Sequence, residues 1–288
     1  MRYEVSAPQA LIDALAALFP ESSRTTLRQM LQTGRVRVNG EVEKNAKREL
    51  EPEDAVDVAE KAVHRNLPPG LAILHEDADV IVVFKAHGLL TVPTERERDT
   101  TVQAYLNAYL GERKGQERIQ VVHRLDRETS GVLVFAKNAY AREQLKEQFA
   151  AHTTDRIYVA LVEGQMDPPS GTFRSYLREM KDLKMVSVDA HPDAKYAVTH
   201  YKTVETNGRY SMLEVQLETG RKNQIRAHLS EAGHPILGDR MYGSEVNPIG
   251  RLGLHAKLLG FDHPVTRKHM VFTAPVPKRF RELLTRRE

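Results

Sequence analysis

The stretch VVHRLDRETSGVLVFAK, residues 121–137, places a cluster of charged side chains between two apolar runs. The runs QVV and GVLVFA have the composition of buried strands, and HRLDRETS between them is predicted to be a loop at a sheet end. Loops in this position often carry catalytic groups. Asp126 lies between Arg124 and Arg127, and neighbouring positive charge favours the ionised carboxylate. The loop therefore presents a candidate catalytic aspartate.

The same spacing also fits a purely structural aspartate. Asp126 could cap the turn that precedes Thr129-Ser130-Gly131, or it could pair with one of the adjacent arginines. The loop alone does not choose between these roles, so the choice depends on the rest of the chain.

The chain from Leu71 onward is rich in strand-like runs with few helices between them. This order favours an α+β fold, with a mixed, mostly antiparallel sheet and flanking helices, over a doubly wound parallel sheet. The runs are LAILHED, DVIVVFKA, GVLVFAK, RIYVALVEG, YAVTHYKTVE and YSMLEVQLE, and the expected helices lie at about 101–113, 139–150, 222–233 and 278–286.

Residues 1–60 are predicted to form a separate small unit. Residues 9–18 have apolar side chains at helical spacing, and SSRTTLRQMLQTG predicts a second helix that ends at Gly34. RVRVNGEVEKNA alternates around Asn39-Gly40, a strong hairpin signal. The polar stretch KAVHRNLPPG, residues 61–70, is the expected linker, followed by a larger domain over residues 71–288.

Charge is distributed unevenly in this N-terminal unit. Basic residues dominate from Arg24 to Arg48, whereas residues 49–60 are mostly acidic. We expect the basic half to face phosphates and the acidic half to remain solvated. The candidate phosphate-binding residues are Arg24, Arg28, Arg35 and Arg37.

Composition excludes several classes of function. The 288 residues include no cysteine, which excludes disulfides, thiolate nucleophiles and Cys-ligated zinc and is compatible with the cytoplasm. No apolar run approaches the ~20 residues that span a bilayer. The motifs HExxH, GxxxxGK[ST] and GxGxxG are absent, so we expect no metal, no cofactor and no membrane association.

The pattern HRLDxxTSG followed by AK resembles the signature of the RluA-type pseudouridine synthases. Further blocks agree in order: VIVVFKAHGLLTVP, RIYVALVEG, ETGRKNQIRAHLSEAGHPILGD and LGLHAKLLGFDHP, so that the resemblance covers about residues 71–280. The N-terminal unit is similar to the RNA-binding module of ribosomal protein S-four, which ends in a GxVxVNG hairpin, here GRVRVNG. The resemblance implies the pseudouridine synthase fold and an enzyme that isomerises uridine in structured RNA without a cofactor.

The resemblance also assigns roles to catalytic residues. Asp126 becomes the catalytic carboxylate, and Arg221 of TGR is the candidate cation that keeps it ionised. Tyr158 of RIYVA matches a tyrosine that stacks on the uracil and takes part in proton removal at carbon 5. On an apolar strand, Tyr158 could otherwise be an ordinary core residue.

Other residues are expected to contact the RNA. Arg124 is assigned to the space that the flipped uridine leaves, and Leu254 to packing against the flipped base, although core packing of Leu254 would look the same. His123 either orders the loop or contacts substrate. Lys137 and Lys85 end strands near the same block and either contact phosphate or are solvated.

Two departures from the family pattern bear on target choice. The chain has KAHGL where the family usually has Lys-Pro before Gly-Leu, and Lys222-Asn223 replace a common Thr-His pair. We expect ribosomal RNA of the large subunit as substrate and a monomeric enzyme, with transfer RNA as the alternative substrate. An inactive RNA-binding or ribosome-assembly protein is a second alternative, and a glycosidase that uses Glu128 as its second acid is a third.

Overall fold

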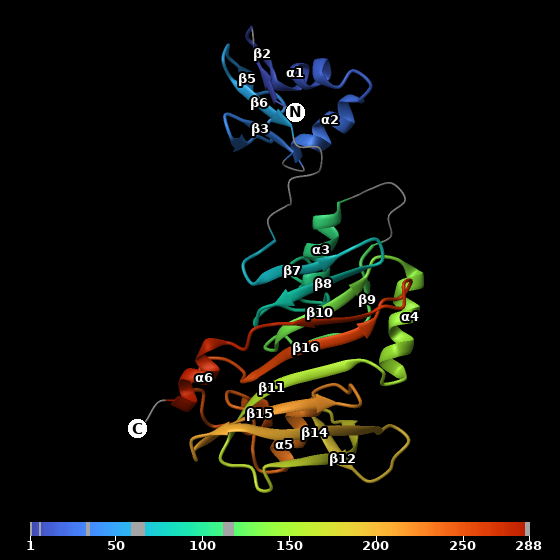
Figure 1. The fold of residues 1–288 in the computed structure, drawn as a ribbon, viewed down its shortest axis with the longest axis vertical. Coiled ribbons are helices and arrows are strands. Elements are labelled where there is room, and N and C mark those ends of the chain that lie inside the picture. The colour runs from blue at the N-terminus through green and yellow to red at the C-terminus, as the bar shows by residue number, and fades with distance from the viewer. Residues whose placement is uncertain (1, 6, 33–34, 59–66, 112–117, 286–288) are drawn as a thin grey trace. The chain divides into compact units, whose positions relative to one another are not determined.

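The structure is a computed structural model, and it describes residues 2–5, 7–32, 35–58, 67–111 and 118–285 (Figure 1). The chain divides into two compact units, one of residues 1–68 with 106–113 and the other of residues 69–105 with 114–288. Most of the predicted linker, and Gly34 at the predicted end of the second helix, lie outside the described residues. The domain boundaries at residues 60 and 71 therefore stay predictions.

The first unit has a small core between two helices and a four-stranded sheet of order β1-β6-β3-β4. Its apolar side chains come from both helices and from β3 and β6. Strands β2 and β5 form a separate two-stranded ladder. The elements are β1 (Arg2–Glu4), β2 (Gln9–Ala10), α1 (Leu11–Leu18), α2 (Arg24–Gln32), β3 (Val36–Val38), β4 (Glu41–Val42), β5 (Glu49–Leu50) and β6 (Ala55–Val58).

The predicted hairpin at Asn39-Gly40 is confirmed, since β3 and β4 pair antiparallel on either side of it. Both turn residues have positive φ, 53° and 86°, as a tight hairpin turn of this type requires. The Asn39 side chain also accepts a hydrogen bond from the Ala55 amide at 2.9 Å. The alternation of AVDV places Val56 and Val58 in the core. Strand β6 therefore lies within residues 49–60, the mostly acidic stretch that is predicted to remain solvated.

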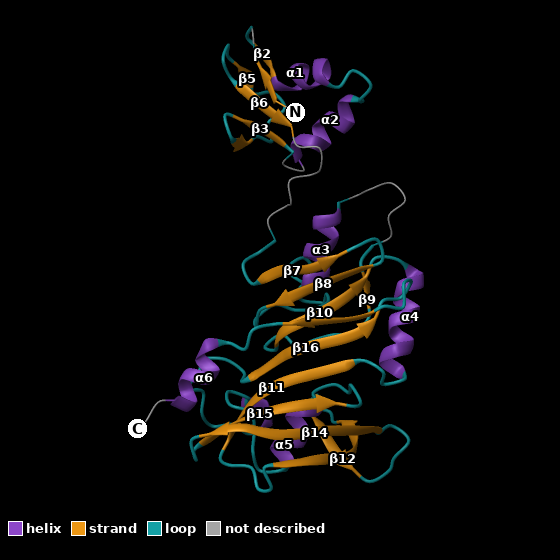
Figure 2. Ribbon diagram, in the orientation of Figure 1, coloured by secondary structure: helices purple, strands orange, loops and turns teal. Residues whose placement is uncertain are grey.

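The second unit is built on one large sheet, and its α+β class is confirmed (Figure 2). The strand order is β13-β12-β14-β15-β11-β16-β10-β8-β7, with β17 beside β16 and β9 beside β10. All pairs are antiparallel except β10 with β16. The strands are β7 (Leu71–Glu76), β8 (Val80–Lys85), β9 (Gln120–Val121), β10 (Ser130–Ala136), β11 (Asp155–Glu163), β12 (Ser170–Glu179), β13 (Met185–Val188), β14 (Lys195–Thr206), β15 (Tyr210–Leu217), β16 (Leu254–Asp262) and β17 (His269–Thr273).

The helices of this unit lie near the predicted ranges. Helix α4 (Ala139–Ala150) matches its prediction, and the Asn138 side chain caps it by accepting from the Ala141 amide at 2.8 Å. Helix α5 (Gln224–Glu231) begins later than predicted, because Asn223 adopts a left-handed backbone with φ 50°. The others are α3 (Val102–Leu110), whose residues from 106 onward are grouped with the first unit, and α6 (Lys278–Thr285), with a 3₁₀ turn, η1, at Arg240–Tyr242. None of the described helices is long and apolar enough to cross a bilayer.

Strand β10 is the buried strand that carries the charged loop. Every residue of Ser130–Ala136 is buried, and the preceding residues 122–129 form the predicted loop at the end of this strand. Gly131 sits where β10 meets β16, with φ 131°, and a Cβ there would lie 2.1 Å from the Ala256 carbonyl oxygen. Only glycine permits this approach. The loop therefore leaves the sheet at a fixed point.

Candidate functional site

A pocket of about 580 Å³ opens where the loop before β10 faces the segment that leads into α5. The C-terminal end of α4 and the first residues of β11 complete its wall. The structure brings six of the predicted site residues together in this wall: His123, Arg124, Asp126, Tyr158, Arg221 and Leu254.

A chain of charges runs from the Asp126 carboxylate into the protein. Asp126 Oδ2 lies 3.4 Å from Arg226 Nη1, and Arg226 forms a two-pronged ion pair with Asp239 at 2.6 and 2.8 Å. Burial alone would lower the pKa of Arg226, but its hydrogen bonds to Asp239 and the Asp239 charge outweigh burial and raise it. The guanidinium is therefore a permanent cation beside Asp126.

This arrangement corrects the expected partner of Asp126. Arg221 is the expected partner, but Arg226, five residues further along the same block, forms the ion pair. Arg221 precedes α5, and its Nε donates to the Tyr196 carbonyl oxygen at 3.0 Å. Both arginines line the pocket, but the two hydrogen bonds to Asp239 hold the Arg226 guanidinium beside Asp126. In the sequence, the second arginine of TGRKNQIR is the residue that could have indicated this ion pair.

Tyr158 lies on the pocket wall at an irregularity of β11, where the register against β16 shifts between Ile157 and Tyr158. Its ring packs at the edge of an apolar cluster that includes Leu254 and Ala160. Burial raises the pKa of Tyr158 to about 12, although the nearby Arg156 charge opposes this effect. The phenol is therefore neutral at neutral pH. Leu254 is buried and lines the same wall.

Arg156 also lines the pocket, although it is not among the site residues predicted from the sequence. It is buried, its Nη2 donates to the Glu218 carbonyl at 2.7 Å, and its guanidinium lies 5.5 Å from the Phe149 ring centroid. A Cβ on Gly220 would come within 2.5 Å of its Nη1, so the glycine of TGR makes room for this side chain. In the sequence, the position of Arg156 two residues before Tyr158, in RIY, is what could have indicated that it lies at the pocket.

His123 has a structural role in the loop. Its Nε2 accepts a hydrogen bond from the Val134 amide at 3.2 Å, and its ring stacks on Phe149 at 4.6 Å. Burial, with a smaller effect of the Arg156 charge, lowers the pKa of His123 to about 3. The ring is therefore neutral, with its proton on Nδ1. Of its two predicted roles, the described contacts support loop ordering.

The segment after β8 holds the Asp126 loop from both sides. The Thr91 hydroxyl donates to the Leu125 carbonyl at 2.7 Å and accepts from the Leu125 amide at 3.2 Å. On the other side of Asp126, the Arg127 carbonyl accepts from the Gly88 amide at 2.8 Å and from Lys85 Nζ at 3.1 Å. These hydrogen bonds fix the backbone on either side of the carboxylate.

Lys85 is fully buried, so the prediction that it contacts phosphate or solvent is wrong. Its ammonium donates to the carbonyls of Ala86, Leu89 and Arg127 at 3.1, 2.7 and 3.1 Å. Burial lowers the pKa of Lys85 to about 7, against the opposing charges of Asp126 and Glu128.

The remaining predicted contact residues are not among the described residues that line the pocket. Lys137 follows β10 at the end opposite to the Asp126 loop, and its ammonium pairs with Glu76 at 2.8 Å. Its phosphate contact is therefore not supported. In the first unit, Arg28 and Arg37 are exposed, Arg24 is exposed and pairs with Asp13, and Arg35 is partly buried.

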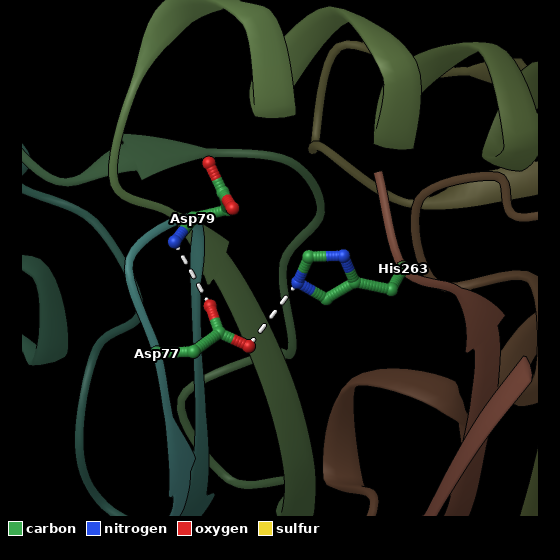
Figure 3. Close-up of side chains that lie close together, drawn as sticks. All are labelled: Asp77, Asp79 and His263. Atoms are coloured by element: carbon green, nitrogen blue, oxygen red, sulfur yellow. Dashed lines mark hydrogen bonds and ion pairs between the residues drawn. The ribbon is translucent and has the colours of Figure 1, made fainter. Parts of the chain in front are cut away.

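One group of described residues has the spacing of metal ligands: Asp77, Asp79 and His263 have ligand atoms within 4.8 Å of one another (Figure 3). The acceptor positions of Asp77 are, however, in use. Its Oδ1 accepts from the Asp79 and Val80 amides, and its Oδ2 from the rings of His75 and His263. A carboxylate offers about four lone-pair positions. The group is therefore a hydrogen-bonded hub, and the absence of a metal stays a prediction.

The chain is similar to proteins of one known family over most of its length. Residues 79–231 match the model described as RNA pseudouridylate synthase, and residues 11–56 match the S4 domain. The Bacillus subtilis (strain 168) protein called uncharacterized RNA pseudouridine synthase YlyB is 36% identical over 279 residues, which cover 94% of this chain and 91% of that protein. Ribosomal large subunit pseudouridine synthase D of Haemophilus ducreyi is 31% identical over 294 residues, covering 95% of this chain and 89% of that protein.

A solved structure agrees with these relatives. Human RNA pseudouridylate synthase domain containing 4 superposes with a TM-score of 0.60 at 28% identity, over 73% of this chain and 90% of that chain. The pocket lies within the region that the family model matches, apart from Leu254.

The lowered pKa of Lys85 predicts a pH-dependent stability. Between about pH 7 and pH 10 the unfolded chain keeps the Lys85 proton while the folded protein has lost it. Unfolding then takes up a proton, so the free energy of unfolding of the wild type should rise with pH relative to Lys85→Met. Urea unfolding at pH 7, 8 and 9 measures this difference, and parallel pH profiles would show that the Lys85 pKa is not lowered.

Proposed function

Because the chain belongs to the RNA pseudouridylate synthase family, we propose that Asp126 is the catalytic aspartate with which it isomerises uridine in RNA. The contact that carries this proposal is the 3.4 Å approach of Arg226 to Asp126 at the wall of the pocket. Asp126 thus faces the pocket with a guanidinium beside it, on a backbone held from both sides.

The reaction breaks the bond between uracil and ribose, turns the base and rejoins it through carbon 5. The carboxylate of Asp126 acts on the ribose or the base, and Tyr158 stacks against the uracil and takes part in removing the proton from carbon 5. The neutral phenol and the buried Leu254 give the base an apolar wall on which to turn. Arg221 at the rim is suited to a phosphate contact rather than to the Asp126 ion pair.

The target uridine must leave its stack before it reaches Asp126, at a cost of a few kcal/mol. Arg124 is exposed at the pocket, two residues before the carboxylate, and its planar guanidinium can fill the vacated space. His123 contributes by holding this part of the loop in place. These positions support base flipping into the pocket.

We infer that the substrate is ribosomal RNA of the large subunit. The support is the resemblance over most of the chain to proteins called ribosomal large subunit pseudouridine synthase D, at 31% to 33% identity. The S4 domain at residues 11–56 adds a second RNA-binding unit. Transfer RNA remains the competing substrate in the test below.

The same enzyme is proposed to act in the cytoplasm as a monomer. The sequence has no cysteine, which suits a reducing compartment. The described residues of one chain form the pocket wall, which is compatible with an enzyme that acts as a monomer.

Asp126→Asn should abolish isomerisation because an amide cannot replace the anion, while RNA affinity should change little because no phosphate contact is removed. Release of tritium from carbon 5 of labelled uridine in unmodified ribosomal and transfer RNA measures the reaction. Wild-type release from ribosomal RNA alone supports the proposed substrate, and release only from transfer RNA contradicts it. Residual turnover near the wild-type level in Asp126→Asn would show that Asp126 is not the catalytic residue.

The N-terminal arginines are expected to contribute affinity through phosphate contacts. Replacing Arg28 and Arg37 with Gln should weaken RNA binding and reduce the slope of log affinity against log salt by roughly 0.7 to 0.9 for each lost contact. The control replaces Lys146 and Lys268, both exposed on the second unit, with Gln. Equal slopes in the two double variants would show that the arginines make no specific contribution.

A further inference from the structure

Two tyrosines are exposed side by side on the large sheet. Tyr176 of β12 and Tyr196 of β14 are direct partners in the register of the two strands, with ring centroids 5.3 Å apart and planes at 53°. The residues are 39% and 42% exposed, although tyrosine is on average largely buried in folded proteins. The fold therefore leaves aromatic surface in solvent at this place.

The pair points away from α5. Its neighbours on β12, Ser175 and Leu177, face that helix: Ser175 hydrogen-bonds His228, and Leu177 packs with Ala227. Because side chains alternate along a strand, Tyr176 projects from the opposite face, and the register places Tyr196 beside it. Helix α5 therefore does not cover the two rings.

The same face is basic and apolar. Arg174 and Arg178 lie two residues on either side of Tyr176, and so they project from the face of β12 that carries the tyrosine. No acidic side chain occupies this face of the described strands β12 and β13, whose other positions near the pair are Thr172, Val186 and Val188. This combination matches a ligand that offers planar rings and negative charge.

The rim of the pocket touches the strand that carries the pair. Arg221, which lines the pocket, donates its Nε to the backbone carbonyl of Tyr196 at 3.0 Å. The tyrosine pair and the pocket lie on opposite faces of the sheet, because Ile225 of α5 packs with Tyr158 and Leu254 at the pocket whereas the tyrosines point away from that helix. RNA that leaves the pocket past Arg221 must therefore pass around the ends of the strands to reach Tyr196.

We propose that Tyr176 and Tyr196 form a stacking platform for an unpaired base of the RNA substrate that lies outside the pocket, with Arg174 and Arg178 beside its phosphates. Unpaired bases in RNA-binding proteins stack on aromatic side chains. Such stacking contributes roughly 5- to 150-fold in affinity for each base. The inference rests on RNA as the substrate of this family and does not depend on the role proposed for Asp126.

The test compares a short fluorescent single-stranded RNA with an abasic version of the same strand, using the full chain. Tyr176→Thr/Tyr196→Thr replaces the rings with another residue that favours strands, and it should lose at least about fivefold affinity for the base-bearing RNA. Its affinity for the abasic strand should stay at the wild-type value. Tyr176→Phe/Tyr196→Phe should restore binding, since the rings remain.

The matched control is Tyr140→Ala, which removes an exposed tyrosine from α4. It should leave both affinities unchanged. Equal losses on both strands, or no loss on either, would overturn the platform. So would sedimentation showing that the threonine variant dissociates a dimer of the wild type, because the face would then bind a second copy of the chain. Thermal unfolding of each variant separates these outcomes from loss of the fold.

Discussion

The ion pair between Arg226 and Asp239 is the constraint on which the geometry of the pocket depends. Asp239 is almost completely buried, with 2% of its side chain exposed, and it occupies Nε and Nη2 of the guanidinium. Only Nη1 remains, and it reaches Asp126 and Asn223. Removing one member of a buried pair costs about 3–5 kcal/mol because the other charge is left alone. The arginine is therefore held in one orientation before any substrate arrives.

The sheet supplies the matching constraint on the other side. The loop that precedes β10 joins the sheet next to Gly131, which lies against the backbone of Ala256, so this end of the loop is fixed. Thr91 then holds Leu125, and Lys85 and Gly88 hold Arg127. Asp126 is the residue between the two anchored positions. The carboxylate and its cation thus come from separate elements, each fixed by contacts that involve no substrate.

The sequence was sufficient for the framework because the framework follows local patterns. The buried run GVLVFA, the Asn39-Gly40 turn and the capped helix at 139–150 each carry their own signal, and the structure shows all three. The residues gathered around Asp126 also follow from the quoted blocks. What the sequence could not decide was which arginine pairs with Asp126, since Arg221 and Arg226 stand in one block and only the left-handed turn at Asn223 separates their environments.

Burial of charged groups was equally hidden in the sequence. Lys85 and Lys137 look like surface lysines at strand ends, yet one is buried among carbonyls and the other is paired with Glu76. Arg156 stands two residues before Tyr158, but its burial against Gly220 does not follow from that position. Each case depends on a partner distant in sequence, which periodicity does not report. Tyr176 and Tyr196 are the opposite case, because these aromatic side chains are exposed. The alternation of side chains along a strand does not show which face of the sheet is covered.

We propose that Arg226 holds the carboxylate of Asp126 in place for the reaction, and single-turnover tritium release at saturating RNA tests this role most directly. One variant is Arg226→Met/Asp239→Asn, which removes both charges of the buried pair so that neither is left alone, and the other is Arg221→Met in the otherwise native chain. We predict that the double variant slows the chemical step by about a hundredfold or more, equivalent to roughly 2.7 kcal/mol, whereas Arg221→Met mainly weakens RNA binding. A slower chemical step in Arg221→Met, with the double variant close to the wild type, would contradict this role of Arg226.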